Sequence, residues 1–195
     1  MEGIDAKEKE CHSEENCYHA QDVELIEILL DACPDAASVT NNNDLYRLHL
    51  ACQHNPSFEV IKMLLQHGKN KETIEKKSRH HGFLSIHFAC SNSKTSIEVI
   101  RCLIPADSED SKVITPVYRK GRLGWTPLQR AIIANHNEDF IELLLRSNYS
   151  ANAPVYDKVN GMLPIHLACL KNCSVKTISF LLEADPENKT FYASV

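Results

Sequence analysis

The hydrophobic residues of this chain recur in short segments with a helical spacing. In one type of segment, apolar side chains occupy positions i, i+3 and i+4, which lie on one face of an α-helix. The spacing occurs five times: Ile26, Leu29 and Leu30; Ile61, Leu64 and Leu65; Ile100, Leu103 and Ile104; Ile141, Leu144 and Leu145; Ile178, Leu181 and Leu182. Runs typical of strands are few. We therefore predict five amphipathic helices and an all-α fold.

A second, shorter apolar segment precedes four of these helices. Each copy contains an Ala followed by Cys or Ile, which we call the small step: Ala51-Cys52, Ala89-Cys90, Ala131-Ile132 and Ala168-Cys169. Small side chains allow two helices to approach closely, and a cysteine at such a position acts as a small hydrophobe. The second segment begins 9, 10, 9 and 9 residues after His49, His87, Gln129 and His166. This near-constant spacing predicts a repeated helix pair, in which the histidines form a structural ladder.

The units are spaced less regularly than the segments inside them. They begin at Asp44, Gly82, Gly124 and Gly161, which are 38, 42 and 37 residues apart, and a half copy begins at Val23. Such a repeat predicts an α-solenoid, because each helix pair can bury its apolar face only against its neighbours. We expect an acidic cap at 1–22, a repeat domain at 23–185 and a tail at 186–195. The domain would hold about five units, at 23–43, 44–81, 82–123, 124–160 and 161–185.

The start of each unit resembles the ankyrin repeat signature, a Gly followed by Thr-Pro-Leu-His. The match is nearly complete in Gly124-Trp125-Thr126-Pro127-Leu128-Gln129 and weaker in Gly161-Met162-Leu163-Pro164-Ile165-His166, Gly82-Phe83-Leu84-Ser85-Ile86-His87 and Asp44-Leu45-Tyr46-Arg47-Leu48-His49. The resemblance covers roughly residues 23 to 185. It implies a stack of helix-turn-helix repeats that binds a partner protein, without catalysis, through its finger loops and concave first-helix face. Because Leu or Tyr replaces Thr in three copies, we expect the turn hydrogen bond of that Thr to be missing there.

Composition and charge narrow the function further. The 195 residues are 43% hydrophobic and carry a net charge of −5, which argues against general nucleic-acid binding. The chain contains no run of 18 apolar residues, which a membrane span would need. Its N-terminal residues do not resemble a secretory signal. The eight cysteines are then expected to be reduced thiols in the cytosol or the nucleus. We expect a monomer without a cofactor.

Two stretches of the chain are locally basic. Residues 62–81 contain six Lys or Arg against two Glu, and residues 112–122 contain four Lys or Arg and no acid. Both lead into successive units, so the two loops should lie side by side and form one basic patch. Such a patch would steer a partner with an acidic or phosphorylated segment. The predicted contact residues are Lys76, Lys77, Arg79, Tyr118, Arg119, Lys120 and Arg122. Solvated loops without a binding role are the alternative.

Two other functions stay open at this point. The cysteine- and histidine-rich chain could belong to a metal-dependent or thiol-based enzyme, with Cys11, His12, Cys17 and His19 as the densest cluster. Structural zinc sites favour Cys pairs two to four residues apart, whereas Cys11 and Cys17 are separated by five residues. No motif of a hydrolase, a phosphate-binding loop or a metalloprotease is present. We assign no catalytic, metal or cofactor residue. The chain could also be a structural fragment of a longer repeat protein.

Overall fold

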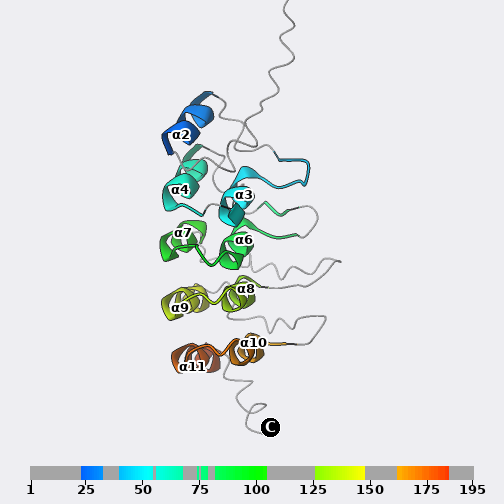
Figure 1. Cartoon of the computed structure of the whole chain (residues 1–195), viewed down its shortest axis with the longest axis vertical. Helices are drawn as coiled ribbons and strands as arrows, with labels where there is room; N and C mark the ends of the chain where they lie inside the picture. The colour runs from blue at the N-terminus through cyan, green and yellow to red at the C-terminus, as the bar shows by residue number, and fades with distance from the viewer. Residues whose placement is uncertain are drawn as a thin grey trace, which may run out of the picture.

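The structure, a computed structural model, consists of paired helices stacked in one direction. It describes residues 23–32, 40–54, 56–67, 74, 76–78, 82–104, 126–147 and 162–184. Two columns of helices run along the stack, and within a unit a short turn joins the first helix to the second (Figure 1). The predicted all-α repeat solenoid is confirmed.

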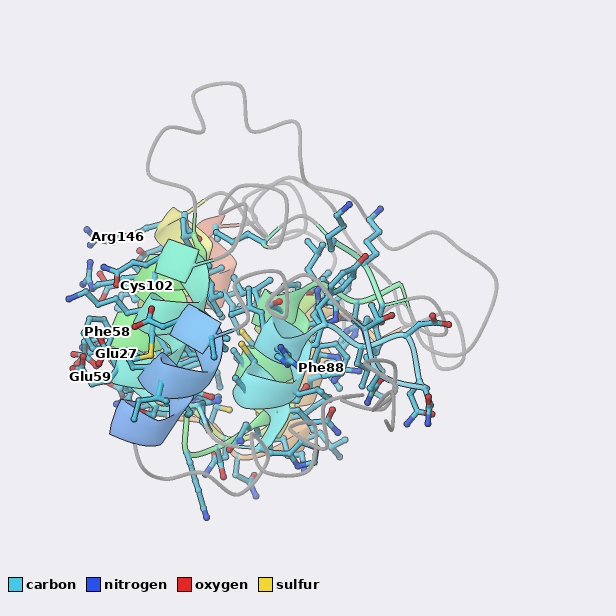
Figure 2. All side chains as sticks on the ribbon, turned by 90° about the horizontal axis from the view of Figure 1, so that it is seen from above. Glu27, Phe58, Glu59, Phe88, Cys102 and Arg146 are labelled. Atoms are coloured by element: carbon cyan, nitrogen blue, oxygen red, sulfur yellow. The ribbon has the colours of Figure 1, made fainter. Side chains whose placement is uncertain are left out.

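The first helix of each pair lies in an inner column, on the side of the described loop residues 40–46, 76–78 and 82–84. The inner helices are α3 (Arg47–His54), α6 (Ser85–Ser91), α8 (Pro127–Ile133) and α10 (Pro164–Leu170). The outer column contains α2 (Val23–Ala32), α4 (Phe58–His67), α7 (Ile97–Leu103), α9 (Glu138–Arg146) and α11 (Val175–Ala184). Seen along the stack, Phe88 lies on the inner column and Phe58 and Cys102 on the outer one (Figure 2). The second helices α4, α7, α9 and α11 begin at the residues that the spacing from His49, His87, Gln129 and His166 predicts.

The helix starts follow from the residues that precede them. Oγ1 of Thr126 accepts a hydrogen bond of 3.2 Å from Gln129 N, and Oδ1 of Asn137 accepts one of 3.0 Å from Phe140 N. These side chains cap otherwise unpaired N–H groups of the first turn. Leu84 and Leu163 make no side-chain cap bond. The predicted loss of the threonine bond is therefore confirmed at these two units.

The turn between the two helices of a unit explains the one irregular spacing. After α8 and α10, Asn135 and Asn172 adopt φ values of 60° and 52°, a left-handed conformation that Asn tolerates. The next residues, His136 and Cys173, donate their N–H groups to the carbonyls of Ala131 and Ala168. After α6 the turn has one more residue. There the Thr95 hydroxyl donates instead to Ala89 O, at 2.8 Å, and so replaces the backbone bond.

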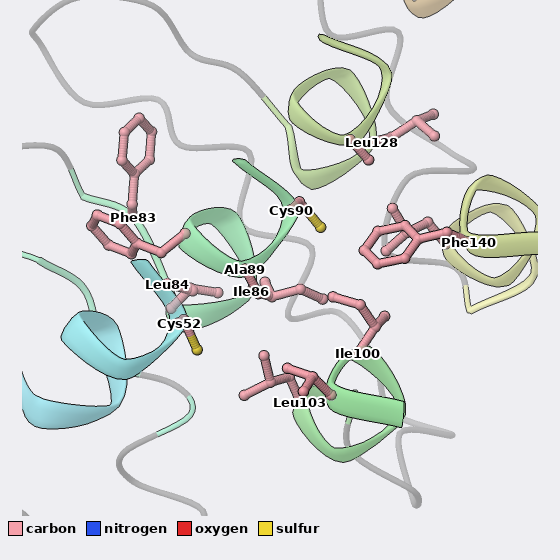
Figure 3. Packing of buried hydrophobic residues seen from close by; sticks show 14 of the residues in the cluster. Cys52, Phe83, Leu84, Ile86, Ala89, Cys90, Ile100, Leu103, Leu128 and Phe140 are labelled. Atoms are coloured by element: carbon pink, nitrogen blue, oxygen red, sulfur yellow. The ribbon is translucent and has the colours of Figure 1, made fainter. Parts of the chain in front are cut away.

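The core is a continuous apolar layer between the two columns. Side chains from α3, α6, α7, α8 and α9 meet in it, among them Cys52, Cys90, Ile100 and Phe140 (Figure 3). The alanine of the small step is fully buried in α6, α8 and α10. Cys52 and Cys90 are fully buried as well, as expected for small residues at a close helix contact. The core thus depends on contacts between units as much as on contacts inside them.

Two details of the sequence interpretation are wrong. Cys169 is exposed, although its counterparts Cys52 and Cys90 are buried. These positions face the following unit, and in the described part of the chain no helix follows α11. The apolar segment around Ile100 is also shorter than expected. Helix α7 ends at Leu103, and Ile104 is its extended C-cap residue.

We predict that an equivalent substitution has unequal effects in two units. Ile100 is fully buried, whereas Ile178 at the same position of the last described unit is half-buried. Ile100→Ala should lower the free energy of unfolding by about 2–5 kcal/mol, because it leaves a cavity in a packed core. Ile178→Ala should cost clearly less. Urea unfolding followed by circular dichroism measures both, and equal losses would contradict this account of the stack.

Candidate partner-binding surface

At the start of each inner helix, one side chain makes the same polar contact. Nδ1 of His49, His87 and His166 accepts a hydrogen bond from the backbone N–H of the residue three positions earlier, at 3.2, 3.1 and 3.0 Å. In the third full unit the acceptor is Oε1 of Gln129, at 2.9 Å from Thr126 N. The contact fixes the angle at which the finger enters the helix, as in a capping box.

The same side chains also connect one unit to the next. Nε2 of His49 lies 3.0 Å from Lys76 O, and Nε2 of Gln129 donates to Met162 O at 3.2 Å. Because Nδ1 of His49 accepts a bond, the ring proton is on Nε2 and is donated to the carbonyl. Lys76 and Met162 both precede the inner helix of the following unit. At these two junctions the ladder therefore holds the residues before the next inner helix against the preceding unit.

The buried histidines of this ladder are neutral. Burial lowers the pKa of His49 to about 4, against a smaller opposing effect of its hydrogen bond to Lys76 O. Burial, and then the charge of Arg130, lower the pKa of His87 to about 3. A protonated ring could not accept the N–H bond at Nδ1. These residues are thus structural, as expected, and they add no charge to the surface at neutral pH.

The inner and outer helices differ in the charged residues that they carry. The four inner helices contain no Asp or Glu, and their permanent charges are Arg47 and Arg130. The outer helices all contain acids, and α4, α7, α9 and α11 contain a Lys or Arg as well; Glu27, Glu59 and Arg146 line the outer margin (Figure 2). On a chain with a net charge of −5, the described inner helices therefore carry only positive permanent charge. A surface of this kind attracts anionic partners.

Two of the predicted contact residues lie on the described part of this side. Lys76 and Lys77 are exposed, in the connection that leads from α4 into α6. Beside them Ser78 is buried, and its Oγ accepts a bond from Phe83 N at 3.0 Å, so the backbone here is anchored. The other predicted contacts lie outside the described residues, namely Arg79, Tyr118, Arg119, Lys120 and Arg122. The side-by-side arrangement of the two basic loops stays a prediction.

Sequence reasoning missed Arg130, which lies on the inner helix α8. The residue follows Gln129, and the equivalent positions after His49, His87 and His166 are Leu50, Phe88 and Leu167. Its guanidinium covers the Phe83 ring, with Cζ 4.0 Å from the ring centroid. A charge at a position that is apolar in the other three units was the signal that could have revealed it.

Four of the five described thiols are not activated. Burial raises the pKa of Cys52, Cys90, Cys102 and Cys173, which keeps these thiols protonated and poorly nucleophilic. Within the described ranges, no group of three or more His, Cys, Asp or Glu side chains could hold a metal ion. The cluster of Cys11, His12, Cys17 and His19 lies outside the described residues.

Comparison with known proteins agrees with this geometry. A family model of three ankyrin repeats matches residues 16–113 and 86–190. The chain belongs to the ankyrin repeat family. No curated protein sequence matches it. Ankyrin repeats generally mediate protein–protein interactions and are typically not catalytic. Among the described segments of this ankyrin repeat protein, none forms a helix that is both long and apolar enough to cross a bilayer.

We predict that acid destabilises the stack through His49 and His87. Their pKa falls from 6.5 in the unfolded chain to about 4 and about 3 in the folded chain. Below about pH 6.5 the unfolded state therefore binds more protons, and the stability contributed by the neutral rings is lost as the pH falls. The free energy of unfolding should decrease by about 1.4 kcal/mol per pH unit for each histidine down to about pH 4.

The chain itself supplies the control for this prediction. Gln129 performs the same two-sided contact without titrating near neutral pH, so the double variant His49→Gln, His87→Gln should keep the bonds. Urea unfolding at a series of pH values should give the variant a shallower pH dependence and nearly unchanged stability above about pH 7. A slope equal to that of the native chain would show that other groups cause the acid sensitivity.

Proposed function

We propose that this chain is a non-catalytic protein-binding module whose partner lies across the finger loops and the inner helices. The division of charge between the two columns carries this proposal. The inner helices contain no acid, and Lys76 and Lys77 are exposed where a finger meets them. A partner segment that is acidic or phosphorylated fits this side, because opposite charges speed association and disfavour wrong partners.

The hydrogen bonds that hold the inner side together support the proposal. His49 and Gln129 hold their own helix start and the next finger base together, and buried Ser78 anchors the backbone beside Lys77. A surface that is ordered before binding loses less conformational entropy when a partner arrives. We further propose that the chain acts as a monomer in the cytosol or nucleus. The cysteine content motivates the compartment.

The test is affinity capture with a charge-reversed chain. Lys76, Lys77, Arg79, Arg119, Lys120 and Arg122 are changed to Glu, and circular dichroism checks that the helices persist. The native chain should retain a partner protein from a cell lysate, and the reversed chain should lose it, because the attraction becomes repulsion.

A matched pair of smaller variants separates a local site from general electrostatics. Lys76→Glu, Lys77→Glu changes the net charge by the same amount as Lys62→Glu, Arg101→Glu, whose exposed side chains belong to the outer helices α4 and α7. Only the first variant should weaken capture. Equal weakening by both, or retention of the partner by the sixfold variant, would place binding elsewhere on the molecule.

A further inference from the structure

The guanidinium of Arg130 is held in a defined position by the preceding unit. It lies over the Phe83 ring, and its Nη1 donates a hydrogen bond to Ser91 Oγ. The Ser91 hydroxyl in turn donates to His87 O at 2.7 Å, and the rings of Phe83 and His87 are stacked with centroids 5.3 Å apart. One side of the guanidinium is thus fixed by contacts from α8 to Ser91 of α6 and to Phe83, which precedes α6.

The charge of Arg130 has no counter-charge in the described part of the molecule. Its side chain forms no ion pair there, and its Nε is buried without a hydrogen-bond partner. Nη2 makes no hydrogen bond to the described residues either, and the Arg130 residue as a whole is half-buried and so keeps some contact with solvent. A half-buried cation without a counter-charge is costly, because the hydration that it has lost is only partly replaced by Ser91 and Phe83. Consistent with this, burial lowers the pKa of Arg130.

Arg130 and Lys77 both contribute positive charge near the His87 ring. The charges of Arg130 and, to a smaller extent, of Lys77 contribute to the lowered pKa of His87, after the larger effect of burial. Both cations therefore act on the same ring, although one comes from an inner helix and the other from a finger. His87 itself stays neutral at physiological pH. The inner helices contribute no acid that would repel an anion at Arg130.

We propose that Arg130 binds an anionic side chain of the partner, a carboxylate or a phosphate, at the contact between α6 and α8. This inference rests on the proposed function and names its contact chemistry. Guanidinium groups bind both anions through charge-assisted, directional hydrogen bonds. The fixed position over Phe83 orients the guanidinium before the partner arrives. A purely structural role, in which Arg130 only joins two units, is the competing explanation.

The decisive experiment follows the arginine Nε–Hε signals of the full-length native chain by nuclear magnetic resonance. The probes are acetate, inorganic phosphate, hexaglutamate and, as a neutral control, hexaglutamine. The Arg130 signal should shift saturably with hexaglutamate and with phosphate or acetate, whichever anion the site prefers. Arg101, which is exposed on the outer helix α7, should shift only weakly and without saturation. An Arg130 signal that stays still, or follows the Arg101 signal, would overturn the proposal.

Variants at the same position test the structural alternative. Arg130→Leu introduces the residue that stands at the equivalent positions Leu50 and Leu167, so it should fold with an unchanged or higher melting temperature. Its affinity for hexaglutamate, followed at the Lys77 amide signal, should fall about tenfold, as expected for a lost charge-assisted contact. Arg101→Leu should leave that affinity unchanged. Equal affinities of the Arg130→Leu and native chains would leave Arg130 with a structural role alone.

The outcome is separable from that of the proposed function. If the anions do not bind at Arg130 but the native chain still captures a partner that depends on Lys76 and Lys77, this inference fails and the proposed function stands. If the anions bind and Arg130→Leu also loses the captured partner, both are supported.

Discussion

The structure depends on one constraint: no helix pair of this chain can bury its apolar face alone. The helices have only seven to ten residues, a length at which isolated helices are marginal in water. Each pair is therefore stable only because the next pair covers it. The cysteine of the small step demonstrates this, since Cys52 and Cys90 are fully buried by a following unit and Cys169 is exposed. Position in the stack, rather than residue type, decides burial.

Apolar contact alone would leave the rotation of one unit relative to the next poorly defined. The His/Gln ladder defines it, because its hydrogen bonds are directional. One side chain accepts a bond from its own helix start and reaches the backbone of the next finger. Burial keeps the rings neutral, so the ladder joins units without placing charge in the core. Gln129 satisfies the same geometry with an amide. The ladder position therefore requires a planar side chain, imidazole or amide, that accepts a hydrogen bond at one end and donates one at the other.

Arg130 is an exception to this uncharged packing, because it places a permanent charge where the other units have apolar residues. Natural cores avoid unpaired charge unless something compensates for it. Within the fold, Phe83 and Ser91 provide partial compensation, and we assign the remainder to an anionic partner. The proposed binding side then has a simple physical basis. It combines a hydrogen-bonded ladder, inner helices without acids and a cation that is already oriented.

The sequence by itself determined the repeat, the helix pairs and the residue at which each second helix starts, because these follow from local periodicity and turn chemistry. The replacement of Thr by Leu likewise predicted the missing cap bonds at Leu84 and Leu163. Only the tertiary structure decided that Cys169 is exposed and that the finger base at Lys76 is bonded to His49. It also decided that Arg130 lies on Phe83. Each of these depends on which unit lies next to which, and contacts between residues distant in the chain leave no local pattern in the sequence.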